Sequence, residues 1–172
     1  RVEELASEDL CGFIFKSKSP SSGMERVKVY PEKGGMPAQK GVGLFAKAFM
    51  ERFPLLPVEE EGRLCDARLR ENFIERIFVL RDWREVSRAL QGPGHEYARL
   101  VDFHSRRKLQ LMAHSPSLAK EMGRLVAEGA RADRAVLAAG YERMLLEAMG
   151  KIATVARNVN VLQHIVGYFR KL

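Results

Sequence analysis

The chain has 172 residues and a net charge of +7, and 46% of its residues are hydrophobic. This composition supports a packed core and excludes a disordered tail. No apolar run is long enough to cross a bilayer, and the N-terminal stretch RVEELASEDL lacks the apolar segment of a signal peptide. We therefore expect a cytoplasmic protein without a membrane partner. Its two cysteines, Cys11 and Cys65, are too few for a disulfide scaffold.

The N-terminal part predicts a small α/β segment. Residues 11–16 read CGFIFK and predict a buried strand, in which Cys11 is a small hydrophobic residue. Residues 27–30 predict a second strand, and the serine-rich text KSKSPSSG lies between the two. Glycine and proline make 31–40 a predicted loop, and a helical apolar period follows over 41–53.

From Asp66 onward the pattern is helical. Asp66 is a predicted N-cap for a helix that runs to about residue 90, and the loop 91–94 is the clearest internal boundary. Four more helices are predicted over 95–114, 116–128, 134–149 and 151–172. Their start signals are Ser115 followed by Pro116, and Asp133.

These elements predict a mainly α fold, in which a small α/β piece is followed by an all-helical bundle. The predicted domains are residues 1–65, a connecting helix and loop over 66–94, and a helical domain over 95–172.

The positive charge is confined to the second part of the chain. Residues 1–98 carry 16 basic and 16 acidic side chains, whereas residues 99–172 carry 13 basic and 6 acidic ones. Such asymmetry indicates either a surface that meets a polyanion or a solvated face of a helical domain. The candidate phosphate-binding residues in this part of the chain include three arginines outside the helix 95–114: Arg124, Arg131 and Arg134.

The predicted helix 95–114 has polar residues on its apolar side. At 100° per residue, one arc contains five apolar side chains: Leu100, Val101, Phe103, Leu111 and Met112. His104, Arg107, Lys108 and His114 fall within the same arc, whereas Arg106 falls opposite to it. Polar groups on a core face are costly unless they are paired or line a wet cavity. His104 and Lys108 therefore indicate either a polar pocket for an anion or a proton transfer, or a satisfied core histidine beside a lysine that reaches solvent.

The last predicted helix repeats this pattern with Asn158 inside an apolar stripe and His164 at its edge. Asn158 either hydrogen-bonds to the helix of His104 or caps a local backbone group. His104, His114 and His164 could supply three imidazoles to zinc, but their spacing matches no metal motif. We therefore expect no metal site in this chain.

The texts GFIFKSKSPSSG, MERVKVY, GVGLFAKAFMERFPLLPVEEEGRL and LRENFIERIF together resemble the C-terminal part of the thiouracil desulfurase family, over residues 10 to about 79. The resemblance implies an incomplete Rossmann-like α/β piece. It also implies an iron–sulfur cluster held by three cysteines, with one iron open to the sulfur of a thiolated uracil. By resemblance, Lys16 and Ser19 lie at the edge of the substrate pocket together with Ser21.

The chain departs from this family at the cluster. Ser22 stands where the motif SPSCG has a cluster-binding cysteine, and a hydroxyl is a hard, poor ligand for iron–sulfur chemistry. The part of the family domain with the other two ligands lies upstream of the matched text, and Cys11 and Cys65 do not match ligand positions. We therefore expect these residues to be a segment of a parent protein that carries the cluster, and to hold no cofactor themselves.

The texts LVDFHSRRKLQLMAHSP and NVNVLQHIVGYFRKL resemble the YbgA family, a helical domain of unknown function, over residues 99–172. The resulting hypothesis is a desulfurase-type parent whose basic helical domain holds tRNA or a thiolated nucleotide. Candidate binding residues are His104, Arg106, Arg107, Lys108, His114 and Asn158. The alternative is a non-catalytic helical module that binds nucleic acid or another protein.

Overall fold

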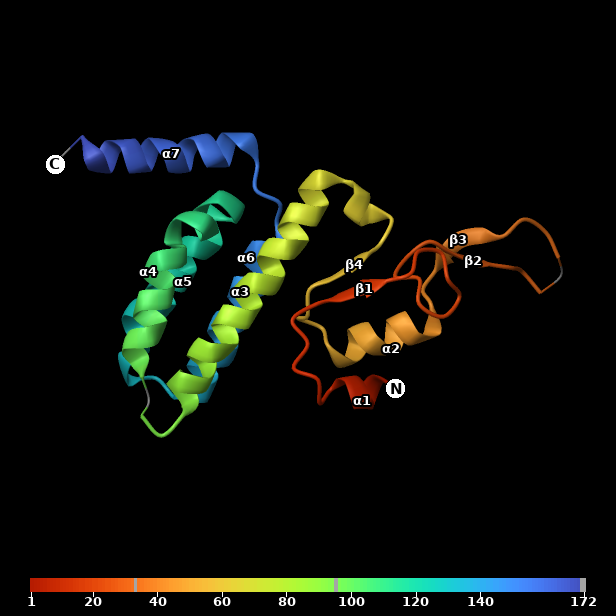
Figure 1. Cartoon of the computed structure of the whole chain (residues 1–172), viewed down its shortest axis with the longest axis horizontal. Helices are drawn as coiled ribbons and strands as arrows, with labels where there is room; N and C mark the ends of the chain where they lie inside the picture. Colours follow the sequence, from red (N-terminus) through yellow and green to blue (C-terminus); the bar gives the residue numbers. More distant parts are fainter. Residues whose placement is uncertain (33, 95, 171–172) are drawn as a thin grey trace. The chain divides into compact units, whose positions relative to one another are not determined.

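The computed structural model describes residues 1–32, 34–94 and 96–170. The chain divides into two compact units, Arg1–Ile77 and Phe78–Leu172, which we call unit 1 and unit 2. The long helix α3 (Ala67–Gln91) runs through the division (Figure 1). The fold is mainly helical with a small strand portion, as the sequence predicts.

Unit 1 contains two small sheets and short helices. Its elements before α3 are α1 (Val2–Leu5), β1 (Phe13–Phe15), β2 (Val27–Val29), β3 (Ala38–Gly41), α2 (Leu44–Arg52) and β4 (Val58–Glu60). The strands β1 and β4 pair in parallel, with Phe13 opposite Val58 and Phe15 opposite Glu60. The helix α2 lies between them in sequence, so these three elements form a β-α-β unit.

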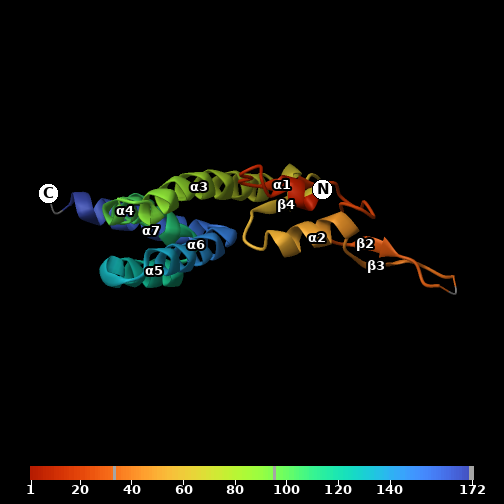
Figure 2. The same cartoon turned by 90° about the horizontal axis from the view of Figure 1, so that it is seen from below.

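The strands β2 and β3 form an antiparallel hairpin with an irregularity between Val27 and Lys28. Figure 2 shows this hairpin extending beyond α2. The loop predicted over 31–40 is wrong in part, because β3 begins inside it at Ala38. The strand β4 was not predicted, because its text VEE carries a single apolar residue and its partner strand is distant in the sequence.

Aromatic rings fill the core of unit 1. Phe49 of α2 is fully buried, and its ring centre lies 4.4 Å from that of Phe13 and 4.8 Å from that of Phe53. Phe15, also buried, meets Phe49 edge-on at 5.6 Å. These ring contacts pack β1 against α2. They therefore fix the distance that the segment between β1 and α2 has to span.

Unit 2 combines the end of α3 with α4 (Tyr97–His114), α5 (Pro116–Glu128), α6 (Arg134–Gly150) and α7 (Val155–Phe169). All four of the predicted C-terminal helices are present. Asp66 and Asp133 act as predicted, because each accepts a hydrogen bond at 2.8–2.9 Å from an N–H in the first turn of the helix that follows. The predicted helix start at His95 and the end at residue 172 lie outside the described residues.

The core of unit 2 is centred on Trp83 and Tyr141. Both are fully buried, and their rings stack with centres 4.7 Å apart, while Phe103 approaches each of them at an angle. The indole N–H of Trp83 donates to Glu142 at 3.1 Å. This cluster joins α3, α4 and α6.

The apolar stripe of α7 remains exposed. Val155, Leu162 and Val166 are 81%, 59% and 48% accessible to solvent. The helix is amphipathic as the sequence predicts, but it contacts α4 through its edge, where Ile165 is half-buried. In the described part of the chain, no helix is both long and apolar enough to cross a membrane.

Candidate functional sites

The SPSSG loop, residues 19–23, is held by its own backbone. The Oγ of Ser19 accepts hydrogen bonds from the N–H groups of Ser21 (3.3 Å) and Ser22 (3.2 Å). The N–H of Gly23 donates to the carbonyl of Ser19 at 2.8 Å. The first serine of the motif therefore sets the turn, and Ser22 lies half-buried at its far side.

The same loop caps α2. The carbonyl of Ser21 accepts from the N–H groups of Phe45 (2.8 Å) and Ala46 (3.2 Å), and that of Pro20 accepts from Leu44 (3.2 Å). The first N–H groups of a helix have no partner within the helix, and here loop carbonyls take the place of a capping side chain. A Cβ at Gly43 would lie 2.3 Å from the carbonyl oxygen of Ser21, so only glycine permits this approach.

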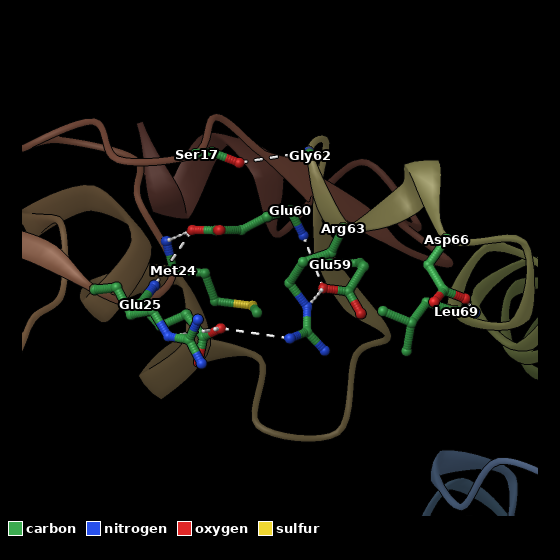
Figure 3. A network of polar contacts seen from close by, with 10 residues as sticks. Ser17, Met24, Glu25, Glu59, Glu60, Gly62, Arg63, Asp66 and Leu69 are labelled. Carbon is green, nitrogen blue, oxygen red and sulfur yellow. Dashed lines mark hydrogen bonds and ion pairs between the residues drawn. The ribbon is translucent and has the colours of Figure 1, made fainter.

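Two buried carboxylates lie beyond the loop, and one of them, Glu60, binds the backbone that follows it. The Oε1 of Glu60 accepts from the N–H groups of Met24 (2.8 Å) and Glu25 (3.3 Å), directly after the loop (Figure 3). Glu59 accepts from the Nε of Arg63 at 2.6 Å. Both glutamates are less than a tenth exposed. Their burial was not predicted, because three consecutive acids after Val58 resemble a solvated turn.

The predicted catalytic residues therefore lie in different surroundings. Ser19 and Ser22 share the anchored loop, whereas Lys16 is exposed and forms an ion pair with Glu61 at 2.7 Å. Ser21 is exposed as well, and its carbonyl, rather than its hydroxyl, accepts the hydrogen bonds from α2.

The side chains that could bind iron do not fit a cluster held by three cysteines. Cys11 is half-buried near the start of β1 and Cys65 is exposed before α3, while the loop offers the hydroxyl of Ser22. Over residues 1–32, 34–94 and 96–170, no group of three or more His, Cys, Asp or Glu side chains could hold a metal ion.

His104 is the centre of the polar site in unit 2. It is buried on α4, and its Nδ1 lies 3.1 Å from the hydroxyl of Tyr141. Burial, and then the charge of Lys108, lower the pKa of His104, and burial raises the pKa of Tyr141. Both groups are thus neutral at pH 7. We assign the hydroxyl of Tyr141 as the donor to Nδ1, which leaves a proton on Nε2.

That Nε2 faces a groove between α4 and α5. A Cβ at Gly123 would lie 3.5 Å from it, so the glycine leaves the imidazole edge uncovered. The groove has a volume of about 570 Å³, and its lining includes His104, Lys108, Lys120 and Arg124. All three cations are exposed, and in the described structure none of them forms an ion pair. Among the residues that the structure describes, no carboxylate lines this groove.

Lys108 lies on the same helical arc as His104, and its side chain reaches solvent, which is one of the two alternatives that the sequence leaves open. It is exposed because α4 packs on α5 and α6 through a narrower face. Val101 of the same arc is 40% exposed.

The two arginines beside Lys108 face a different hollow, of about 530 Å³, that is also lined by acids. Arg106 forms an ion pair with Asp102, and Arg107 forms one with Asp82. The guanidinium of Arg107 also lies over the ring of Phe103. These arginines are neutralised within unit 2, so the structure separates them from the groove.

The remaining candidates have structural contacts or lie apart from the groove. His114 is buried at the end of α4 and its Nδ1 lies 2.6 Å from the carbonyl of Lys151. Arg134 donates to the carbonyls of Gly129 and Ala130. Arg131 and Asn158 are exposed.

Comparison with protein families gives two matches. Residues 1–61 match the model of the 2-thiouracil desulfurase family, and residues 108–172 match that of a protein family of unknown function, DUF1722, which is the YbgA-like domain. These matches confirm that a desulfurase-related segment is fused to a YbgA-like domain. No curated protein and no solved structure matches the chain.

Replacing Gly43 by alanine should release the SPSSG loop from α2, because the new Cβ would overlap the carbonyl of Ser21. We expect faster hydrogen exchange at the amides of Phe45 and Ala46, with the amides of α6 unchanged. The control is Val42→Ala, which shortens an exposed side chain next to it. Unchanged protection in Gly43→Ala would contradict the capping role of the loop.

The stability of unit 2 should fall as the medium becomes acidic. An unfolded chain returns the pKa of His104 to about 6.5, so below that pH the unfolded state binds protons that the folded state does not. Stability is lost between about pH 6.5 and the lower pKa of the folded state. In His104→Gln this part of the pH dependence should disappear, as measured by denaturant unfolding monitored through Trp83.

The control for this measurement is His164→Gln, which removes an exposed histidine from α7. An equal pH dependence in His104→Gln and in the unaltered protein would show that another group is responsible.

Proposed function

We propose that the protein containing these residues removes sulfur from a thiolated uracil, presented as the free base, as a nucleotide or within tRNA. Unit 1 forms part of the site for the base, and unit 2 holds the nucleic acid or nucleotide, in the cytoplasm. The match of residues 1–61 to the 2-thiouracil desulfurase family carries this proposal. The net reaction exchanges the thiocarbonyl sulfur for the oxygen of water and releases hydrogen sulfide, without net oxidation or reduction.

Within unit 1, the SPSSG loop supports a role in orienting the base. The Oγ of Ser19 already accepts two backbone N–H groups, so its remaining capacity is to donate its own proton. A donor of this kind suits the oxygen or sulfur atom of a thiouracil. Because the loop is anchored on α2 and on Glu60, that donor needs no rearrangement when the base binds.

The cluster that the family resemblance implies belongs to the proposal for the parent protein only. The 172 residues alone are proposed to be inactive, since Ser22 replaces the thiolate that would bind iron.

Within unit 2, the groove between α4 and α5 favours an anionic ligand. Lys108, Lys120, Arg124 and the Nε2–H of His104 are all donors, and no carboxylate of the described part of the chain competes with the ligand. Phosphates of a nucleic acid or nucleotide match such a set of donors. The alternative function is a helical module that binds nucleic acid or protein without catalysis, and the exposed apolar stripe of α7 favours its protein-binding form.

Replacing Ser22 by cysteine should restore an iron ligand in the protein encoded by the complete open reading frame. We expect the cysteine form, after anaerobic reconstitution with iron and sulfide, to show cluster absorbance and to convert 2-thiouracil to uracil, with the serine form much weaker in both. The matched control is Ser21→Cys, which places a thiol one residue away. A cysteine form without cluster and without uracil product would refute the desulfurase proposal.

Substitution of Lys108, Lys120 and Arg124 by glutamine should weaken binding of single-stranded RNA to the chain. The slope of log affinity against log salt should flatten by about 0.7 for each phosphate that the variant no longer binds. The measurement is fluorescence anisotropy of a labelled RNA over a series of salt concentrations.

The control is Arg106→Gln together with Arg131→Gln, which removes two exposed arginines outside the groove. An equal effect for each charge removed in the control would mean that unit 2 binds RNA through its overall charge.

A further inference from the structure

A second hollow of unit 2 lies between α4 and α7, and we call it the α4–α7 pocket. It has a volume of about 440 Å³, and most of its surface is apolar. Its walls include Leu109 and Met112 of α4 and Ile165, Tyr168 and Phe169 of α7. No binding site was predicted for these side chains, because apolar residues at helical spacing usually indicate a packed core.

The two helices that form the pocket are joined at one end by a hydrogen bond. The Nη1 of Arg157, in the first turn of α7, donates to the carbonyl of His114 at the end of α4, at 2.9 Å. Farther along α7, Ile165, Tyr168 and Phe169 are spaced three and four residues apart, which places them on one face of the helix. That face and the adjoining face of α4 therefore form the pocket together.

Two aromatic rings of the pocket are open to solvent. Tyr168 and Phe169 are 65% and 67% exposed, and their ring centres lie 5.8 Å apart with the rings nearly perpendicular. Leu109 of the opposite wall is 39% exposed. A flat apolar ligand can therefore cover ring surface that is now in contact with water.

The α4–α7 pocket adjoins the groove between α4 and α5, because Lys108 and Met112 line both of them. A lysine side chain can lie along an apolar surface with its methylene groups and still direct its ammonium group elsewhere. The groove on the other side of Lys108 contains two further cations, Lys120 and Arg124. One ligand can therefore place an apolar ring in the pocket and a negative charge in the groove.

The charge around the pocket favours an anionic ligand over a cationic one. Residues 151–172 contain no aspartate or glutamate. The polar side chains that border the pocket are Lys108 and His164, and no carboxylate of the described residues lines it. Flat apolar rings next to negative charges are the chemistry of a single-stranded nucleic acid, whose bases stack on aromatic side chains while its phosphates meet cations.

We propose that the α4–α7 pocket binds an unpaired base of RNA against the rings of Tyr168 and Phe169, next to a phosphate held by Lys108. This proposal rests on the proposed function, because the same strand would continue into the α4–α5 groove. Stacking accepts any base, since every base has a flat face. Unit 2 then distinguishes the unpaired nucleotides of an RNA from a double helix, in which the bases are stacked on one another.

The test compares an RNA strand that has bases with a strand that lacks them. Binding of a short labelled oligoadenylate, and of an abasic strand of the same length, to the 172-residue chain is measured by fluorescence anisotropy. The abasic strand keeps the phosphates and loses the groups that would enter the pocket, so we expect it to bind more weakly. Neither strand contains sulfur, so the result does not depend on desulfuration.

The decisive variant is Tyr168→Leu together with Phe169→Leu, which removes both rings and keeps the pocket apolar. We expect a loss of affinity of about tenfold for oligoadenylate, as for the loss of one stacked base. The affinity for the abasic strand should stay unchanged, which also shows that the variant is folded. The matched control is Phe78→Leu, which removes a ring that is 50% exposed on α3 and lies outside both hollows.

An oligoadenylate affinity that is unchanged in the decisive variant would overturn the proposal, as would equal losses for the two strands. An equal loss in Phe78→Leu would overturn it too. A dimer of the chain that sedimentation equilibrium detects, and that the decisive variant abolishes, would assign the pocket to a second copy instead. These failures would leave the phosphate groove and the proposed reaction standing, whereas a failed desulfuration test would leave the base pocket unaffected.

Discussion

The capping of α2 by the carbonyl of Ser21 is the contact on which the arrangement of unit 1 depends. Two N–H groups at the start of α2 donate to this one oxygen, and Gly43 permits the approach. Without that contact, the loop between β1 and β2 would have only its own turn and Glu60 to hold it. With it, the backbone at Ser22 has a fixed position. The α2 core of phenylalanines therefore supports the loop as well as the sheet.

The helices could be predicted because their signals are local. Asp66, Asp133 and Pro116 lie within a few residues of the helix starts that they determine, so the chain alone reveals them. The strand β4 could not be predicted in this way, because its partner β1 is more than forty residues away in sequence. The burial of Glu59 and Glu60 depends on the same distant pairing, so the role of Glu60 in holding the backbone after the loop is absent from any local pattern.

The helical arc places His104 and Lys108 on one face of α4, and the structure buries His104 while Lys108 reaches solvent. A helical arc gives the direction of the apolar face of a helix, but it does not give the width of the surface that becomes buried. In α4, the buried part of the arc contains Phe103, His104 and Leu111. Charge counts have a similar weakness. They show an excess of basic residues in unit 2. They cannot show that Arg106 and Arg107 pair with Asp102 and Asp82, whereas Lys108, Lys120 and Arg124 have no acidic partner among the described residues.

The stack of Trp83 on Tyr141 gives the molecule an internal optical probe. Trp83 is the single tryptophan of the chain, and its neighbour Tyr141 is the hydrogen-bond partner of His104. Indole emission responds to the polarity and to the charges within its immediate surroundings. Its intensity is therefore expected to follow the state of the imidazole beneath the α4–α5 groove, without any added label.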